Sequence, residues 1–351
     1  MLKNPLILNN ELIEYSCYKK KYKDDGLIVR LYERNGKNVK LDLTKTSLKN
    51  KHLTLVNFLE EPLSEQIDGD ILEFKPFEVK TIWIQLASEI KEVYNCCIFD
   101  NYNYDYFEVT NSKISNLYSL TKNIVSLCIG ILIDQGKLNI KDDISKFFID
   151  EYENAVSYSG TTVEDVLMQV TGIERGFLDI DAEDPKTFPS DDYLKIIFDR
   201  GLYYKDKKHF VYSDSNYYLL GRLVGKISGV SLDKFIEENI FKPLEIKNYD
   251  FQYCPMGYQM GATGVFLNSI DVCKIASIFM YDGKYKDKVI VSKKYIDEAK
   301  KVKVIVDENT GYGYSIWINR NSNLRHGSGM WGQMFVIRDD KIYCFLSLDK
   351  E

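Results

Sequence analysis

The chain has 351 residues, of which 45% are hydrophobic and 28% are charged, and its formal net charge is −6. This composition is that of an ordinary globular protein, and the length suggests about two domains. The negative charge and the lack of a basic stripe argue against nucleic-acid binding. No apolar run reaches the roughly 18 residues of a membrane span.

Seven cysteines and three histidines are scattered along the chain without the spacing of a disulfide framework or a metal site. We therefore expect buried free thiols, a cytoplasmic location, and no metal or other cofactor. Met1–Glu11 contains neither an apolar core nor a small-residue cleavage site, so no secretory signal is expected.

Residues 1–92 are predicted to form an N-terminal all-β, sandwich-like domain. Short stretches with strand-like apolar patterns are separated by turn-forming residues, among them the Asn35–Gly36 pair. The expected strands cover residues 27–32, 39–43, 53–59, 71–74 and 79–86. The domain boundary falls in the irregular region 88–110, which contains a candidate hairpin from 96–99 to 106–109.

Residues 93–351 are predicted to form an α/β (α+β) domain, because helix-period segments in the middle are followed by strands near the end. The first expected helix covers 119–136, with Gly136 in a C-cap position. Further helices are expected at 163–170, 191–199, 217–227, 232–238 and 270–281, and strands at 312–318, 333–337 and 342–348.

Ser119 and Lys122 form a Ser-x-x-Lys motif where the first helix begins. Residues three apart lie on one face of a helix, so the lysine would stand beside the serine hydroxyl. A serine nucleophile needs such a neighbouring base or cation, and a helix N-terminus also favours a developing oxyanion. The motif occurs five times in the chain, but only this copy leads into a long apolar helix.

Two further segments follow in order, Tyr212-Ser213-Asp214 and His326-Gly327-Ser328-Gly329. Together with Ser119-x-x-Lys122, they resemble the three active-site motifs of class C β-lactamases and related penicillin-binding proteins, esterases and amide hydrolases. In that family the motifs read Ser-x-x-Lys, Tyr-x-Asn and Lys-Thr-Gly or His-x-Gly. The flanking stretches 261–266 and 311–314 agree as well, so the resemblance covers residues 110–348.

This resemblance implies an antiparallel sheet flanked by helices and an acyl-enzyme mechanism. Ser119 would attack a carbonyl, Lys122 would keep the site positive, and Tyr212 would move the proton as base or relay. The backbone N–H of Ser119 and one from the strand after His326 would form the oxyanion hole. The residues expected to line the substrate and oxyanion pocket are Asp214, His326, Gly327, Ser328 and Gly329.

Two residues depart from the family pattern. Asp214 stands where the family usually has Asn, and its acceptor-only carboxylate would hold Lys122 charged and repel an anionic substrate such as a β-lactam. Ser328 occupies the glycine position of His-x-Gly.

The ends of the second segment also depart from the family, which usually has a helix and two strands before the serine motif and a helix after the last strand. Only Val93–Val109 is available upstream. The outer face of the sheet is therefore predicted to lack its usual cover, which would leave an apolar patch suited to oligomer formation.

The first segment resembles a second family. Gly26–Glu33, Asn57–Glu61 and Lys75–Ile82 are similar to stretches in the C-terminal β-domain of glycoside hydrolase family 38 α-mannosidases, over residues 5–90. The catalytic domain of that family, with its zinc ligands, lies upstream of this region. The resemblance implies a stabilising or carbohydrate-contacting domain without mannosidase chemistry.

The leading hypothesis from the sequence is a serine hydrolase that acts on a small ester or amide through Ser119. A second is a catalytically impaired or non-catalytic binding protein, because Asp214 and the missing terminal elements weaken the family pattern. A third is a carbohydrate-binding or α-mannosidase-related role through residues 1–92. Esterase, amidase, peptidase and β-lactamase activities share these motifs, so the substrate stays open.

Overall fold

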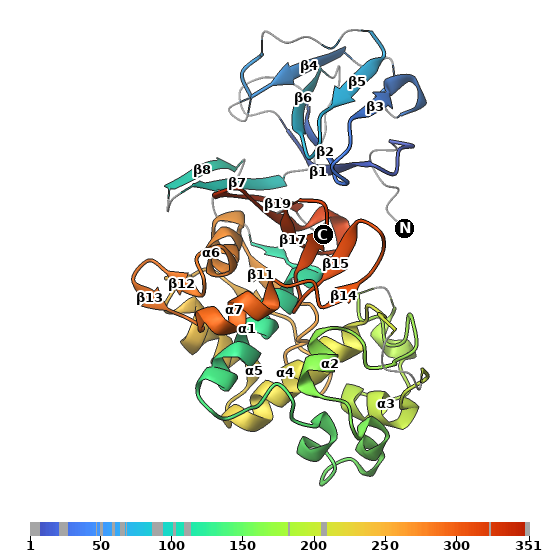
Figure 1. Cartoon of the computed structure of the whole chain (residues 1–351), viewed down its shortest axis with the longest axis vertical. Helices are drawn as coiled ribbons and strands as arrows, with labels where there is room; N and C mark the ends of the chain where they lie inside the picture. Colours follow the sequence, from blue (N-terminus) through green and yellow to red (C-terminus); the bar gives the residue numbers. More distant parts are fainter. Residues whose placement is uncertain are drawn as a thin grey trace.

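The structure is a computed structural model that divides along its long axis into a smaller β-domain and a larger mixed domain (Figure 1). The β-domain contains the N-terminal strands, and the mixed domain contains the helices and the C-terminal strands. The described residues are 8–20, 27–46, 48–49, 52–57, 60–63, 67, 69–85, 94–100, 103–108, 114–181, 183–204, 209–322 and 324–347.

The β-domain is a sandwich of two antiparallel sheets. A four-stranded sheet has the order β1-β2-β6-β4, and β3 pairs with β5 in the second sheet. Its strands are β1 (Ile13–Lys20), β2 (Leu27–Glu33), β3 (Val39–Asp42), β4 (His52–Val56), β5 (Ile71–Phe74) and β6 (Val79–Gln85). The five expected strands are confirmed within their central residues, whereas β1 was not predicted because its polar and aromatic sequence lacks a clear apolar alternation.

The mixed domain is built on an eight-stranded antiparallel sheet with the order β14-β15-β16-β17-β18-β19-β7-β8. Its strands are β7 (Tyr94–Asp100), β8 (Asn103–Glu108), β14 (Val304–Ile305), β15 (Thr310–Tyr312), β16 (Trp317–Asn319), β17 (Arg325–Ser328), β18 (Met334–Arg338) and β19 (Lys341–Ser347). The expected hairpin is present as β7–β8, and β7 pairs with β19. The single strand expected at 312–318 is wrong, because a turn with Ser315 at φ 66° divides it into β15 and β16.

Helices cover the inner face of this sheet and form a lobe beyond it (Figure 1). They are α1 (Thr121–Asp134), α2 (Val163–Leu167), α3 (Tyr193–Arg200), α4 (Asp214–Ser228), α5 (Leu232–Ile236), α6 (Ser269–Met280) and α7 (Lys293–Ala299). Helix α6 packs on β7 and β19, and α4 packs on α1. Because α1 is surrounded on all sides, almost every side chain in it is buried, including the polar Lys122 and Asn123. Gly136 follows α1 with φ 67°, as its predicted C-cap role requires.

The two domains share a packed interface on the outer face of the large sheet. Strand β1 contacts β7 and β19. Strand β2 is buried on both faces: Leu27, Val29 and Leu31 belong to the sandwich core, while Ile28 and Arg30 are also 0% exposed. The Arg30 guanidinium lies 5.9 Å from the centre of the Phe345 ring of β19. The expectation of an uncovered outer face is therefore wrong over β7 and β19, because the β-domain packs there.

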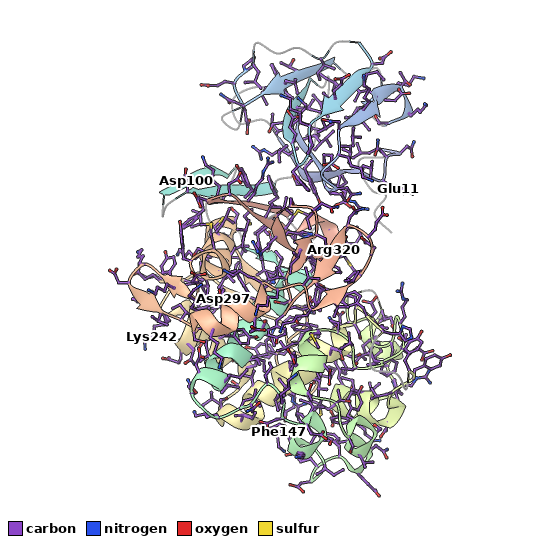
Figure 2. The ribbon with its side chains drawn as sticks, in the orientation of Figure 1. Glu11, Asp100, Phe147, Lys242, Asp297 and Arg320 are labelled. Atoms are coloured by element: carbon purple, nitrogen blue, oxygen red, sulfur yellow. The ribbon has the colours of Figure 1, made fainter. Side chains whose placement is uncertain are left out.

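Figure 2 shows the extent of the molecule, with Glu11 on the β-domain and Phe147 at the far end of the helical lobe. Among the described residues, five cysteines are buried and form no disulfide, which agrees with the expected thiols. Among the described residues, no helix is both long and apolar enough to cross a membrane.

Candidate active site

Ser119 lies in a short helical turn, Tyr118–Leu120, that leads directly into α1. Tyr118 has φ 46°, a left-handed conformation that a bulky residue adopts only when its surroundings hold it there. Asn116 Oδ1 supplies this support by accepting hydrogen bonds from the backbone N–H groups of Tyr118 (2.9 Å) and Gly264 (3.2 Å). The residue before the candidate nucleophile is therefore fixed by a buried side chain from β9 (Ser115–Asn116).

Lys122 connects Ser119 to two distant parts of the chain. Its Nζ donates hydrogen bonds to Ser119 Oγ (2.8 Å), Asp214 Oδ1 (2.6 Å) and the Ala262 carbonyl oxygen (3.1 Å). An ammonium group has three N–H donors, so all three find an acceptor. The Lys122 side chain is 1% exposed and that of Asp214 is 7% exposed, so this is a buried ion pair.

The environment of Lys122 determines its charge. Burial disfavours the ammonium form, but Asp214, together with Tyr212, outweighs burial and raises the pKa of Lys122 above its ordinary value. Lys122 is therefore a cation at neutral pH, as the substitution of Asp for Asn in the second motif predicts. The other oxygen of Asp214 accepts a hydrogen bond from the Ile180 backbone N–H (3.1 Å), which attaches one wall of the site to α4.

Tyr212 is held by a group of aromatic rings beside Lys122. Lys122 Nζ lies 4.9 Å from the centre of the Tyr212 ring. The ring stacks on Trp317 of β16, with centroids 5.5 Å apart and planes at 29°, and it meets the edge of Tyr312 at 6.3 Å. The sequence did not single out Trp317, because its approach to Tyr212 depends on where β15 ends and β16 begins.

These residues line a cavity of about 280 Å³ that has three walls. One wall comes from loop 176–181, the second from Tyr212–Asp214, and the third from Trp317 with residues 328–330. The loop contributes two carboxylates, Asp179 and Asp181, which sequence reasoning missed. Burial, and then the neighbouring Asp214 carboxylate, raises the pKa of Asp181 to about 6.

The glycines of the third motif allow β17 to lie close to the start of α1. A Cβ on Gly327 would lie 2.5 Å from the Phe335 ring and 2.6 Å from Asn123 Oδ1. A Cβ on Gly329 would lie 2.5 Å from the Leu117 carbonyl oxygen and 3.2 Å from the Ser119 backbone nitrogen. The close approach of β17 to α1 therefore requires a glycine at position 327. The serine at position 328 does not prevent this approach.

The hydrogen-bond ladder indicates which N–H of this strand faces the cavity. Gly329 N–H donates to the Gln333 carbonyl oxygen (2.7 Å), and Ser328 pairs with Met334 in the same register. Hydrogen-bonded and non-hydrogen-bonded pairs alternate in an antiparallel ladder, so the Ser328 N–H points away from β18. On that side, the pairing of β17 with β16 stops at Trp317 and His326 and does not reach Ser328. The backbone N–H groups of Ser119 and Ser328 are thus the candidate oxyanion donors.

His326 does not line the cavity at Ser119. Successive side chains of a strand point to opposite faces, so with Gly327 against α1 the His326 ring lies on the outer face of the sheet. There it lines a second cavity with residues of the β-domain and stacks on Trp317, with centroids 6.3 Å apart and planes at 12°. Burial, with Arg34 nearby, lowers the pKa of His326 to about 4, so the ring is neutral at physiological pH.

Comparison with known proteins identifies both segments. Residues 102–346 match the beta-lactamase family, and the chain therefore belongs to that family, whose members are generally serine hydrolases. Residues 13–82 match the glycosyl hydrolases family 38 C-terminal beta sandwich domain. The two resemblances inferred from the sequence and the predicted fold class are confirmed.

Individual relatives are distant. Protein flp of Staphylococcus aureus (strain MW2) is 28% identical in an alignment 197 residues long, which covers 51% of this chain and only 39% of that protein. The octameric penicillin-binding protein homologue from Pyrococcus abyssi has a TM-score of 0.59 at 22% identity, covering 74% of this chain and 70% of that chain. FmtA from Staphylococcus aureus has a TM-score of 0.57 at 18% identity, covering 75% and 88%. These structural similarities establish the fold.

Breaking the buried ion pair is expected to destabilise the protein. Lys122→Met would leave the Asp214 carboxylate buried without its cation, at a cost of about 3–5 kcal/mol in the free energy of unfolding. Adding Asp214→Asn to that variant should recover much of the loss. Urea denaturation measures both effects, with Lys242→Met, which breaks an exposed pair with Glu238, as the nearly silent control. Equal stability of the single and double variants would contradict the charge argument.

Gly329→Ala is expected to impair turnover more than folding. The added methyl group would displace the backbone around Ser119 and its N–H, and loss of an oxyanion donor lowers kcat about a hundredfold or more. Turnover of p-nitrophenyl acetate and the melting temperature should be measured together. Gly225→Ala in α4 is the control, because its Cβ would lie 3.5 Å from the Val230 carbonyl oxygen, an ordinary contact. An unchanged kcat in Gly329→Ala would rule out this oxyanion geometry.

Proposed function

We propose that the protein is a serine hydrolase that forms an acyl-enzyme at Ser119 with an ester or amide substrate. The observation that carries this proposal is the 2.8 Å hydrogen bond between Lys122 Nζ and Ser119 Oγ at the wall of the 280 Å³ cavity. A buried cation stabilises the negative charge that develops on a serine oxygen as its proton leaves. A serine nucleophile needs this kind of activation.

In the proposed reaction Lys122 stays an ammonium group throughout. Ser119 Oγ attacks the substrate carbonyl, its proton passes through Tyr212 to the leaving oxygen or nitrogen, and the bond to that atom breaks. The N–H groups of Ser119 and Ser328 hold the developing oxyanion. Water then attacks the acyl-enzyme, returning a proton to Ser119 Oγ and releasing a carboxylic acid.

The charges around the cavity favour uncharged or cationic substrates. The cavity lining includes the carboxylates of Asp179, Asp181 and Asp214. Lys122 is buried beside Ser119, and its three donors are already used. An anionic substrate would approach the Asp181 carboxylate in a partly desolvated site, where electrostatic repulsion is stronger than in water. We therefore infer that the substrate is a neutral or amine-bearing ester or amide.

Labelling with a fluorophosphonate probe tests the nucleophile. The wild type should be labelled, and Ser119→Ala should abolish labelling and hydrolysis of p-nitrophenyl acetate without lowering the melting temperature. Tyr212→Phe should lower kcat about a hundredfold or more, because it removes the proton relay. Tyr203→Phe, which removes the hydroxyl of an exposed tyrosine outside the cavity lining, serves as the control. Labelling that persists in Ser119→Ala would refute the assignment.

The charge preference should depend on pH through Asp181. Its pKa of about 6 means that it is protonated at pH 5 and ionised at pH 7. The kcat/KM ratio of acetylcholine to its uncharged analogue 3,3-dimethylbutyl acetate should therefore rise about tenfold between these pH values. Acetate release can be followed by NMR. In Asp181→Asn the ratio should stay low at both pH values, while the exposed Asp184→Asn should behave as wild type; a ratio independent of pH in the wild type would oppose this role.

A further inference from the structure

A second cavity lies where the β-domain meets the large sheet. It has a volume of about 510 Å³ and is called the interdomain cleft below. The β-domain lines it with Glu14, Tyr32, Arg34 and Asn35, and the mixed domain lines it with the turn 306–310 and with side chains on the outer face of β16, β17 and β18. Ligand sites occur preferentially at such domain boundaries.

The walls of the interdomain cleft are held in place before any ligand arrives. Glu14 accepts a hydrogen bond from the Tyr32 hydroxyl and forms an ion pair with Arg34. Across the boundary, Asn319 Nδ2 donates to the Arg34 carbonyl oxygen (3.3 Å), and the Arg338 guanidinium donates to the Phe77 carbonyl oxygen. A preformed cleft loses less conformational entropy on binding than one that must be ordered by its ligand.

The interdomain cleft and the cavity at Ser119 share two wall residues, Trp317 and Ser328. The Trp317 ring stacks both on Tyr212, beside the cavity at Ser119, and on His326, which lines the cleft. The Ser328 N–H is a candidate oxyanion donor, so the shared wall is next to the expected position of the substrate carbonyl. The two cavities therefore adjoin at Trp317 and Ser328, and a substrate that occupies both would place its carbonyl beside Ser119.

The groups that line the interdomain cleft are polar and mixed in kind. Carboxylates at Asp307 and Glu308 accept hydrogen bonds, and amides at Asn35 and Asn319 both donate and accept. Asp307 already accepts hydrogen bonds from Asn309 and Thr310, and Glu308 accepts one from Asn309, but carboxylates keep further lone pairs for a ligand that donates hydrogen bonds. A polyanion would meet an excess of carboxylates. A chain of hydroxyl groups on apolar rings satisfies both kinds of wall, because the hydroxyls pair with the carboxylates and amides and the rings contact aromatic surfaces such as Tyr32.

We propose that the interdomain cleft binds a neutral polyhydroxylated chain, such as an oligosaccharide, that carries the acyl group cleaved at Ser119. The use of the cleft in catalysis rests on the proposed hydrolase function, whereas saccharide binding in the cleft does not. In this proposal the β-domain determines substrate specificity. Asn35, which lines the cleft from the β-domain, is the residue substituted in the test.

The test compares small and extended acetyl esters in variants of the Asn35–Lys37 turn. Asn35→Trp fills the cleft, and Lys37→Trp places the same side chain at an exposed position outside it. The two extended substrates are O-acetylated xylotetraose and O-acetylated chitotetraose. For at least one of them, the kcat/KM of the wild type should exceed that for methyl acetate. Asn35→Trp should lower that value about tenfold and leave p-nitrophenyl acetate unchanged, the size expected from losing one or two hydrogen bonds. Lys37→Trp should change neither.

Several outcomes would overturn the proposal. It fails if neither saccharide ester exceeds methyl acetate, or if Asn35→Trp changes small and extended esters equally. It also fails if the higher kcat/KM that Asn35→Trp removes is found with an O-acetylserine in an uncharged tetrapeptide and with neither saccharide ester. If p-nitrophenyl acetate is not hydrolysed at all, the hydrolase function fails separately. Calorimetric titration with the unacetylated tetrasaccharides then tests saccharide binding in the cleft independently of catalysis. The wild type and Lys37→Trp should bind, and Asn35→Trp should not. The absence of binding heat in the wild type would refute saccharide binding.

Discussion

The buried ammonium group of Lys122 organises the candidate active site through its three hydrogen bonds. It draws together Ser119 at the start of α1, Asp214 at the start of α4 and the Ala262 carbonyl oxygen, which are far apart in the sequence. A buried charge that lacks partners costs several kcal/mol, so the folded state must keep these three segments in contact. The same interaction joins α1 to α4 and places a cation beside the Ser119 hydroxyl.

Asp214 changes the character of this site relative to the Tyr-x-Asn pattern of the family. Its carboxylate neutralises Lys122 and, through the Ile180 N–H, positions the loop that carries Asp181. The proximity of Asp214 also contributes to the raised pKa of Asp181. One departure from the family pattern thus affects the charge of Lys122, the position of a cavity wall and the ionisation of Asp181.

Much of the site could be predicted from the order of the motifs. Ser119, Lys122, Tyr212, Asp214, Ser328 and Gly329 all lie at one cavity or contact it, and the roles assigned to them remain proposals. His326 could not be placed correctly, because a motif records the order of residues but not which face of a strand each side chain occupies. Trp317 and Asp181 carry no motif of their own, and they reach the cavity only through the register of β16 and the course of loop 176–181.

Local periodicity and side-chain chemistry were enough to predict a β-domain followed by a mixed domain, the helical setting of Ser119 and Lys122, and the charge of Asp214. Long-range packing alone buries β2 on two faces, so that Arg30 lies over the Phe345 ring of the large sheet while Leu27, Val29 and Leu31 belong to the sandwich core. Long-range packing joined the β-domain to the outer face of that sheet and thereby created a cleft beside the candidate active site. No local pattern encodes such an interface, since the residues on its two sides are separated by most of the chain.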